Sequence, residues 1–180
     1  MKAACLQMDM LFAQPEENFA KAKRLIRDAM ASEPDVVVLP EDWSAGFSDE
    51  MFHHMEDFVE PENGPSVTVL RELARQYQVW VVGGSIATLH ADGKMRNTTF
   101  LIDRRGEIVG DYSKMHLYSD MDEHVPFANG DKTEVYDTEL GRLGITTGVK
   151  LGNAVKRNFV RHRIRALYRT NEAGLQPGYD

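Results

Sequence analysis

The sequence predicts an α/β protein in which helices pack on a sheet of short apolar strands, followed by a basic helical tail. Three observations predict it: apolar runs at 36–39 and 79–82, amphipathic patterns that begin at Pro15 and Pro65, and a reversal of charge near residue 148. Short apolar runs bounded by turn residues are typical of buried strands. Strands that alternate with helices are typical of the α/β class.

The first half of the chain alternates strands with helices. Residues 2–9 predict a strand, and Pro15 begins a helix whose apolar positions recur every three or four residues. Residues 36–39 predict the next strand, residues 41–64 a loop, and Pro65 begins the second helix. Each helix thus follows a strand in the chain, which is the order expected of an α/β sheet.

The second half predicts strands joined by tight turns. A Gly-Gly pair directly after the strand at 79–82 allows the backbone to approach another group closely. An Asp-Gly pair at 92–93 predicts one hairpin turn, and an Arg-Gly pair at 105–106 predicts a second. Residues 133–136 and 142–147 predict a further pair of strands.

The composition is that of a folded domain with no membrane partner. The chain has 180 residues, 42% of them hydrophobic and 27% charged, which excludes a disordered or collagen-like protein. No apolar run approaches the roughly 18–20 residues of a membrane span, and the N-terminus lacks the apolar stretch of a signal peptide. Cys5 is the only cysteine, so no intrachain disulfide can form. We expect a cytoplasmic protein that uses no metal or cofactor.

The charge of the chain changes sign near residue 148. Residues 148–180 hold seven basic and two acidic side chains, a net charge of +5, whereas residues 1–147 hold 14 basic and 26 acidic, a net charge of −12. Residues 153–169 predict one amphipathic helix with an arginine at every fourth position from 157 onward. This asymmetry indicates either a basic arm for a polyanion or a solvated basic helix on an acidic body.

Two opposite charges follow predicted strands. Glu41 comes directly after the apolar run at 36–39, and Lys114 follows the strand predicted at 107–112. Open α/β sheets bind ligands at the carboxyl ends of their strands, so the two side chains are candidates for one cleft. Taken singly, each is more commonly a solvated loop charge or half of an ion pair.

Six segments of residues 1–147 recur together, in this order, in one known family. They are KAACLQMD at 2–9, VVVLPEDWSAGF at 36–47, VVGGSIA at 81–87, NTTFLID at 97–103, GEIVGDYSKMHLYS at 106–119 and GRLGITT at 141–147. With these segments the chain resembles the nitrilase superfamily of carbon–nitrogen hydrolases, especially its small amidase-like members. The resemblance implies a four-layer α-β-β-α sandwich, usually paired into a homo-oligomer, that hydrolyses a small amide through a cysteine.

The resemblance also implies roles for residues of this chain. Glu41 is the general base, Lys114 stabilises the tetrahedral oxyanion, and Glu123 is a second glutamate that positions the substrate. The family's nucleophilic cysteine follows the segment at 141–147, and Gly148 stands there in this chain. Because loss of a covalent nucleophile costs on the order of 10⁶ in rate, we expect an inactive amidase.

Two features of the family have no counterpart in this chain: the nucleophilic cysteine and the second half of the sandwich. Cys5 is not expected to replace the nucleophile, because a cysteine in an apolar strand is usually a small buried core residue. The family's second half-sandwich follows its cysteine and has no counterpart here. We therefore expect an incomplete sandwich with uncovered apolar sheet surface, and a marginally stable or self-associating protein.

The basic tail resembles a different family. Residues 141–180, which include GNAVKRNFVRHR at 152–163 and PGYD at 177–180, resemble the protein component of bacterial ribonuclease P. In that family an arginine-rich helix contacts a catalytic RNA. Phosphate recognition needs several cations, which a row of arginines provides. Phe159 and His162 stand where that family has arginines. The resemblance implies RNA binding by Lys156, Arg157, Asn158, Arg161, Arg163 and Arg165.

We therefore expect two domains, a truncated nitrilase-like domain at 1–147 and a ribonuclease P protein-like basic helical segment at 148–180. The first hypothesis is a carbon–nitrogen hydrolase by descent that has lost its activity. The second is an RNA-binding ribonuclease P component that carries the larger domain as a passenger. The third is a chimeric or artefactual fusion with neither function intact, since residues 142–147 match both families at the point of the switch.

Overall fold

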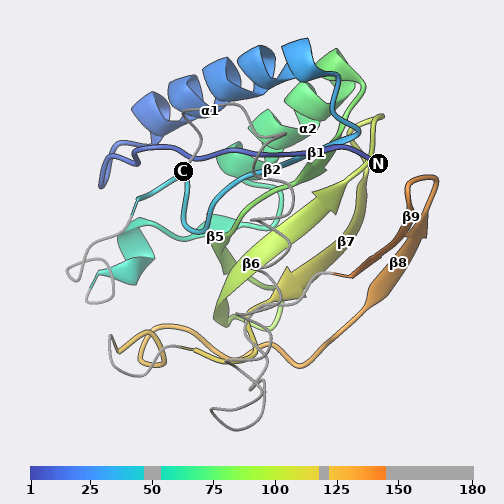
Figure 1. The fold of residues 1–180 in the computed structure, drawn as a ribbon. Coiled ribbons are helices and arrows are strands. Elements are labelled where there is room, and N and C mark those ends of the chain that lie inside the picture. Colours follow the sequence, from blue (N-terminus) through green and yellow to red (C-terminus); the bar gives the residue numbers. More distant parts are fainter. Residues whose placement is uncertain (47–53, 118–121, 145–180) are drawn as a thin grey trace, which may run out of the picture. The chain divides into compact units, whose positions relative to one another are not determined.

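A computed structural model describes residues 1–46, 54–117 and 122–144 of the chain (Figure 1). Gly148 and the helix predicted at 153–169, with every residue expected to bind RNA, lie outside these ranges. Within them, no helix is long and apolar enough to cross a membrane.

A mixed sheet of seven strands forms the centre of the described chain (Figure 1). Its strands are β1 (Ala3–Cys5), β2 (Val36–Val38), β3 (Glu60–Pro61), β4 (Trp80–Val82), β5 (Ile86–Leu89), β6 (Met95–Ile102) and β7 (Ile108–Ser113). They lie in the order β1-β2-β4-β6-β5-β3, with β7 paired to β6. The pairs β1–β2 and β2–β4 are parallel, and β6 is antiparallel to β4, β5 and β7. The α/β prediction is therefore confirmed.

Strands β4 and β5 pair with successive parts of β6, separated by a break at Gly84. Val82 lies opposite Leu101, and Ile86 lies opposite Thr98. Gly84 has φ +63°, and a Cβ there would overlap the carbonyl oxygen of Pro40. Only glycine meets both conditions without strain. The break thus brings the β4–β5 connection against the end of β2, as the Gly-Gly pair in the sequence predicts.

Two helices cover one face of the sheet (Figure 1). Helix α1 (Pro15–Ala29) and helix α2 (Pro65–Tyr77) each begin at a proline, whose fixed φ suits the first helical position. Full burial of a large apolar side chain contributes about 1.5–3 kcal/mol, so this layer supplies much of the stability. The buried core between helices and sheet includes Phe19, Ala22 and Ile26 of α1, Val67, Leu70 and Leu73 of α2, and Val37, Val81, Phe100 and Ile102 of the sheet.

Asn18 of α1 ties the loop after β2 to the helix layer. Its side chain is fully buried, donates hydrogen bonds to the carbonyls of Leu11 and Ser44, and accepts one from the Leu11 amide. The three distances are 2.7, 3.0 and 2.8 Å respectively. Because a buried amide must be hydrogen-bonded, this arrangement fixes the loop that begins at Glu41.

A two-stranded hairpin packs against the face of the sheet opposite the helices. It consists of β8 (Val135–Thr138) and β9 (Gly141–Gly144). Its Tyr136, Leu140 and Leu143 pack against a buried cluster of the sheet that includes Trp80 and Leu101. Glu139 accepts a hydrogen bond of 2.9 Å from the Trp80 ring nitrogen. The hairpin therefore covers part of the apolar sheet surface that is expected from the sequence to be uncovered.

The first strand differs from its prediction in length and in burial. It spans Ala3–Cys5, whereas the sequence predicts a strand over residues 2–9. The prediction that Cys5 is a buried core residue is wrong, because its thiol-bearing side chain is exposed. In β1, an edge strand, Ala4 packs on the helix layer and the alternate side chains face outward.

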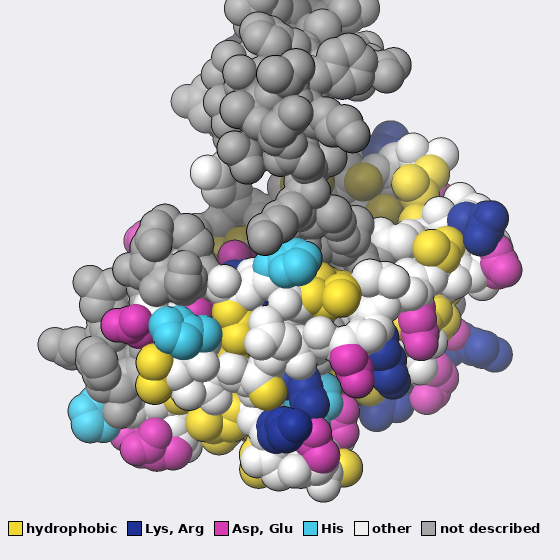
Figure 2. Space-filling model, turned by 90° about the horizontal axis from the view of Figure 1, so that it is seen from below, with side chains coloured by type: hydrophobic (Ala, Val, Ile, Leu, Met, Phe, Trp, Pro, Cys, Tyr) yellow, Lys and Arg dark blue, Asp and Glu magenta, His cyan; other side chains and the backbone are white. Residues whose placement is uncertain are grey.

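Charged side chains of both signs share the described surface. Figure 2 shows acidic and basic side chains lying next to each other on one face, with hydrophobic side chains between them. In the described chain, Arg96 and Asp92 form a pair joined by two hydrogen bonds of 2.9 and 2.7 Å. The acidic excess of this part of the chain therefore does not gather into a single patch on that face.

Candidate active site

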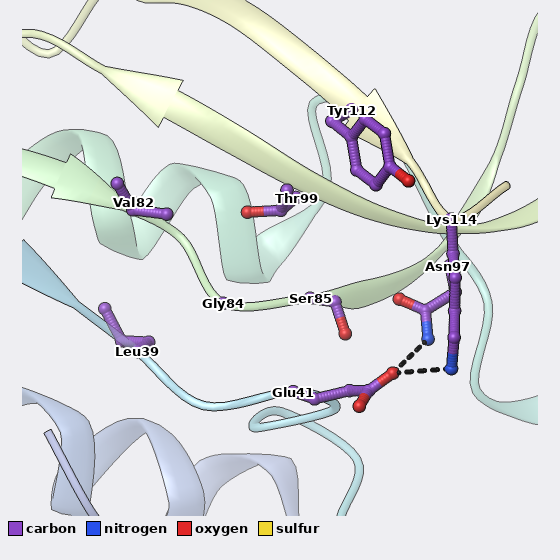
Figure 3. A pocket seen from close by; sticks show the side chains of 9 residues that line it. All are labelled: Leu39, Glu41, Val82, Gly84, Ser85, Asn97, Thr99, Tyr112 and Lys114. Carbon is purple, nitrogen blue, oxygen red and sulfur yellow. Dashed lines mark hydrogen bonds and ion pairs between the residues drawn. The ribbon is translucent and has the colours of Figure 1, made fainter. Parts of the chain in front are cut away.

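Glu41 lies just beyond the end of β2, where backbone hydrogen bonds hold Leu39 and Pro40 in place. The amide of Leu39 donates to the carbonyl of Val82 at 3.0 Å, and the amide of Ser85 donates to the carbonyl of Pro40 at 3.2 Å. These bonds tie the end of β2 to the β4–β5 connection. The Glu41 side chain is 58% exposed and lines a cavity (Figure 3).

Lys114 lies directly after β7 and reaches two carboxylates. Its Nζ is 3.0 Å from Oε1 of Glu41 and 2.9 Å from Oε2 of Glu123. Its backbone amide donates to the carbonyl of Asn97 at 2.8 Å, and its carbonyl accepts from the Gly130 amide at 2.9 Å. The three residues for which the sequence implies catalytic roles, Glu41, Lys114 and Glu123, therefore lie together.

Glu123 is buried in a turn that an apolar cluster holds in place. The residue is 3% exposed, and its carbonyl accepts a hydrogen bond of 3.3 Å from the Phe127 amide. Phe127 packs with Met55 and Ala87 in a buried cluster separate from the helix layer. A carboxylate this deeply buried needs charged or hydrogen-bonding partners, which Lys114 supplies.

Asn97 is a fourth member of the centre that the sequence does not predict. Its Nδ2 donates to Oε1 of Glu41 at 3.0 Å (Figure 3). It also donates to Oε1 of Glu123 at 3.2 Å. It is 2% exposed and lies on β6. Its one signal in the sequence is its place at the start of the segment NTTFLID. Asn97 holds the two carboxylates in a common orientation.

The electrostatics of the centre keep Lys114 protonated. Burial lowers the pKa of Lys114, but its hydrogen bonds to Glu123 and Glu41 outweigh that effect and raise the pKa above its usual value. The ammonium is therefore a fixed positive charge at neutral pH. Fixed cations of this kind stabilise negative charge that develops on a carbonyl oxygen.

A cavity of about 190 Å³ adjoins these side chains (Figure 3). A volume of this size has room for roughly six water molecules, which suits a ligand much smaller than a drug-sized molecule. Within the described ranges no group of three or more His, Cys, Asp or Glu side chains could hold a metal ion. The cavity is lined by Leu39, Glu41, Val82, Gly84, Ser85, Asn97, Thr99, Tyr112 and Lys114.

Known proteins match this chain over most of its length. Residues 2–155 match the family described as Carbon-nitrogen hydrolase. This match extends past the domain boundary expected at residue 147. The 2-oxoglutaramate amidase of Bacillus subtilis is 29% identical over 136 residues, covering 76% of this chain and 51% of that protein. The Omega-amidase NIT3 of Saccharomyces cerevisiae is 28% identical over 156 residues, covering 81% of this chain and 54% of that protein.

The fold matches solved structures of the same kind. The crystal structure of Saccharomyces cerevisiae Nit3, a member of the nitrilase superfamily, matches with a TM-score of 0.71 and 27% sequence identity. That match covers 81% of this chain and 54% of Nit3. The chain thus spans about half the length of the relatives it matches.

Proposed function

Because this chain belongs to the carbon–nitrogen hydrolase family, we propose that its Glu41–Lys114–Glu123 centre binds a small amide without hydrolysing it. The observation that carries the proposal is the Lys114 ammonium, which lies within 3.0 Å of both carboxylates beside a cavity. One cation and one exposed carboxylate at the same edge match the two ends of an amide dipole. The carbonyl oxygen accepts from Lys114, and the amide N–H donates to Glu41.

The centre supplies a base and an oxyanion partner but no thiol. Glu41 is exposed enough to take a proton from a nucleophile, and Lys114 would stabilise the oxyanion formed by its attack. By its resemblance to the family, the nucleophile position is Gly148, which has no side chain. Cys5 is not among the residues that line the cavity. Acyl transfer through a cysteine is therefore not part of the proposed function.

The proposed ligand is the amide of a short carboxylic acid. Two relatives bear the names 2-oxoglutaramate amidase and Omega-amidase NIT3, and both names denote enzymes that act on amides. A cavity of about 190 Å³ suits a ligand of that size. Its walls include the side chains of Leu39, Val82 and Tyr112, which would pack on the methylene groups between the two polar ends.

Calorimetric titration with succinamate tests the proposal. We expect saturable binding to the native chain, and a Kd raised about tenfold or more in Lys114→Met, because a charge-assisted hydrogen bond is lost. Lys94→Met is the matched control, since it removes an exposed lysine from a hairpin turn. Ammonia release from succinamate should be absent. Equal affinity in both variants, or turnover that depends on Glu41, would contradict the proposal.

We propose a second, separate function for residues 148–180, which is RNA binding. The observation that favours it is the arginine at every fourth position from 157 to 169, within a segment of net charge +5. The residues concerned are Lys156, Arg157, Asn158, Arg161, Arg163 and Arg165. Contacts with phosphates release counterions, so affinity for RNA should fall steeply with salt.

Fluorescence anisotropy with a labelled precursor tRNA over a salt series tests this second function. Replacing Arg157 and Arg161 by alanine should weaken binding and reduce the slope of log affinity against log salt by roughly one to two. Replacing Arg24 and Arg27 by alanine removes the same charge from the exposed side of α1 and serves as the control. Equal weakening in the two double variants would reject a binding site in the tail.

A further inference from the structure

Asp42 is a buried carboxyl group directly beside the centre. The residue is 7% exposed, and its Oδ1 atom is buried with no hydrogen-bond partner in the part of the chain that the structure describes. Its backbone lies in the left-handed region at φ +49°, and its amide donates to the Ser85 hydroxyl at 3.1 Å. An ionised carboxylate in such a place carries a large desolvation cost, so the group favours its neutral form.

The charges that face Asp42 strengthen this preference. Glu41 on the same loop and Glu123 in the turn at 122–126 both disfavour a third negative charge. Among the described residues, Lys114 is the cation that acts on Asp42, and its ammonium is already shared between those two carboxylates. In this part of the chain, three carboxyl groups thus lie near one ammonium. Their combined charge is −2 when all are ionised and −1 when one holds a proton.

We propose that Asp42 is a positioning residue that stores a proton for the Glu41–Lys114–Glu123 centre. The proton on Asp42 sets the charge of the centre without any contact between Asp42 and a ligand. The inference rests on the burial of Asp42, on its unpartnered Oδ1 atom within the described residues and on its place next to Glu41. It is independent of amide binding.

The electrostatics of the site support this role. Burial, followed by the charges of Glu41 and Glu123, raises the pKa of Asp42 from 3.8 to about 7, while Lys114 and the Ser85 hydroxyl oppose the shift. The carboxyl of Asp42 therefore gains or loses its proton near neutral pH rather than in the acid range usual for aspartate. Additional negative charge nearby favours the protonated form of Asp42, and additional positive charge favours its ionised form.

Carbon-13 NMR of protein labelled at the aspartate carboxyl carbons tests the proposal. In a titration from pH 4 to pH 9 we expect one aspartate resonance with a midpoint near 7, which is missing from Asp42→Asn. Glu41→Gln, which removes a neighbouring negative charge from an exposed position, should lower that midpoint by on the order of half a pH unit or more. Lys114→Met should raise it by a similar amount.

The two neighbour variants separate a proton store from a carboxyl that is merely buried. A group isolated from the centre would keep the same midpoint in both variants, and that result would overturn the proposal. A midpoint below 5 in the native chain would overturn it as well. Because the titration uses no ligand, a failure of amide binding leaves its result unaffected, and the two proposals can fail separately.

Discussion

Lys114 Nζ lies 3.0 Å from Oε1 of Glu41, although the two residues are 73 positions apart in the chain. The contact joins the end of β7 to the end of β2, across β6 and β4, which lie between them in the sheet. The same ammonium also reaches Glu123, so one lysine side chain balances two carboxylates. The predictions below follow from this arrangement and from the backbone that supports it.

Lys114→Met should destabilise the fold, because it leaves the carboxylate of Glu123, whose side chain is 4% exposed, without its cation. Removing one partner of a buried ion pair costs about 3–5 kcal/mol, and the remaining hydrogen bond from Asn97 places the expected loss near the lower end. Urea unfolding followed by tryptophan fluorescence measures it. Lys94→Met should change stability by less than about 0.5 kcal/mol, and Lys114→Met with Glu123→Gln should recover part of the loss.

Asp42→Asn should stabilise the protein at pH 8 and change little at pH 4. Since folding raises the pKa of Asp42 from 3.8 to about 7, the folded state holds a proton that the unfolded chain has released between these values. The stability contribution of this group therefore falls as pH rises through that window, by on the order of a few kcal/mol. Unfolding of both proteins at a series of pH values measures the difference.

The control for this pH series is Glu72→Gln, which changes an exposed carboxyl on α2. Its stability should run parallel to that of the native chain at every pH, because this side chain is exposed to solvent. If Asp42→Asn also ran parallel to the native chain, the raised pKa of Asp42 would be refuted.

Gly84→Ala should cost more than Gly93→Ala, although both glycines have positive φ. The Cβ of an alanine at 84 would overlap the carbonyl oxygen of Pro40, whereas nothing lies within 4 Å of a Cβ at 93. Alanine at a positive φ costs about 1 kcal/mol, and the backbone overlap should bring the loss at 84 to about 3 kcal/mol or more. Thermal unfolding measures both variants, and similar losses would show that the β4–β5 break does not depend on this contact.

Gly148→Cys should gain acylation that depends on Glu41. A thiol at the family's nucleophile position would be activated by the base, whereas the native chain offers only Cys5, which is exposed on β1. The variant is best made in a Cys5→Ser background and treated with an activated ester of a short acid, with intact mass recording the acyl adduct. Adding Glu41→Gln should slow labelling by roughly 10²-fold or more. Equal labelling rates with and without Glu41 would contradict the assigned position.

The helices and hairpins could be predicted because their signals are local. Pro15 and Pro65 each mark the first helical residue, and the Asp-Gly and Arg-Gly pairs mark turns in which Gly93 and Gly106 take positive φ. Cys5 could not be placed correctly by the same means. Ala4 faces the helix layer and Cys5 faces the other way, so burial in β1 depends on which face α1 covers rather than on the apolar run.

Two residues of the candidate site could be predicted because each is a charge that follows a strand, in a segment shared with the family. These are Glu41 and Lys114, whereas Glu123 was predicted from the family resemblance alone. The structure brings the three together, while their catalytic roles stay predictions. Asn97 lies within β6, and nothing local shows that its side chain faces the two carboxylates. Asp42 adjoins Glu41 in the sequence, but its burial follows from the left-handed turn at that position.

The α/β class, the starts of both helices, the hairpin turns and the family can be read from the sequence, because these depend on periodicity, turn residues and segment order within short windows. The three-dimensional fold alone shows that one ammonium serves two carboxylates, that Asn97 bridges them, and that Asp42 is buried next to Glu41. Those relations join residues from β2, β6, β7 and the turn at 122–126. Burial and the interactions between charges depend on distances in space, and no local pattern along the chain encodes those distances.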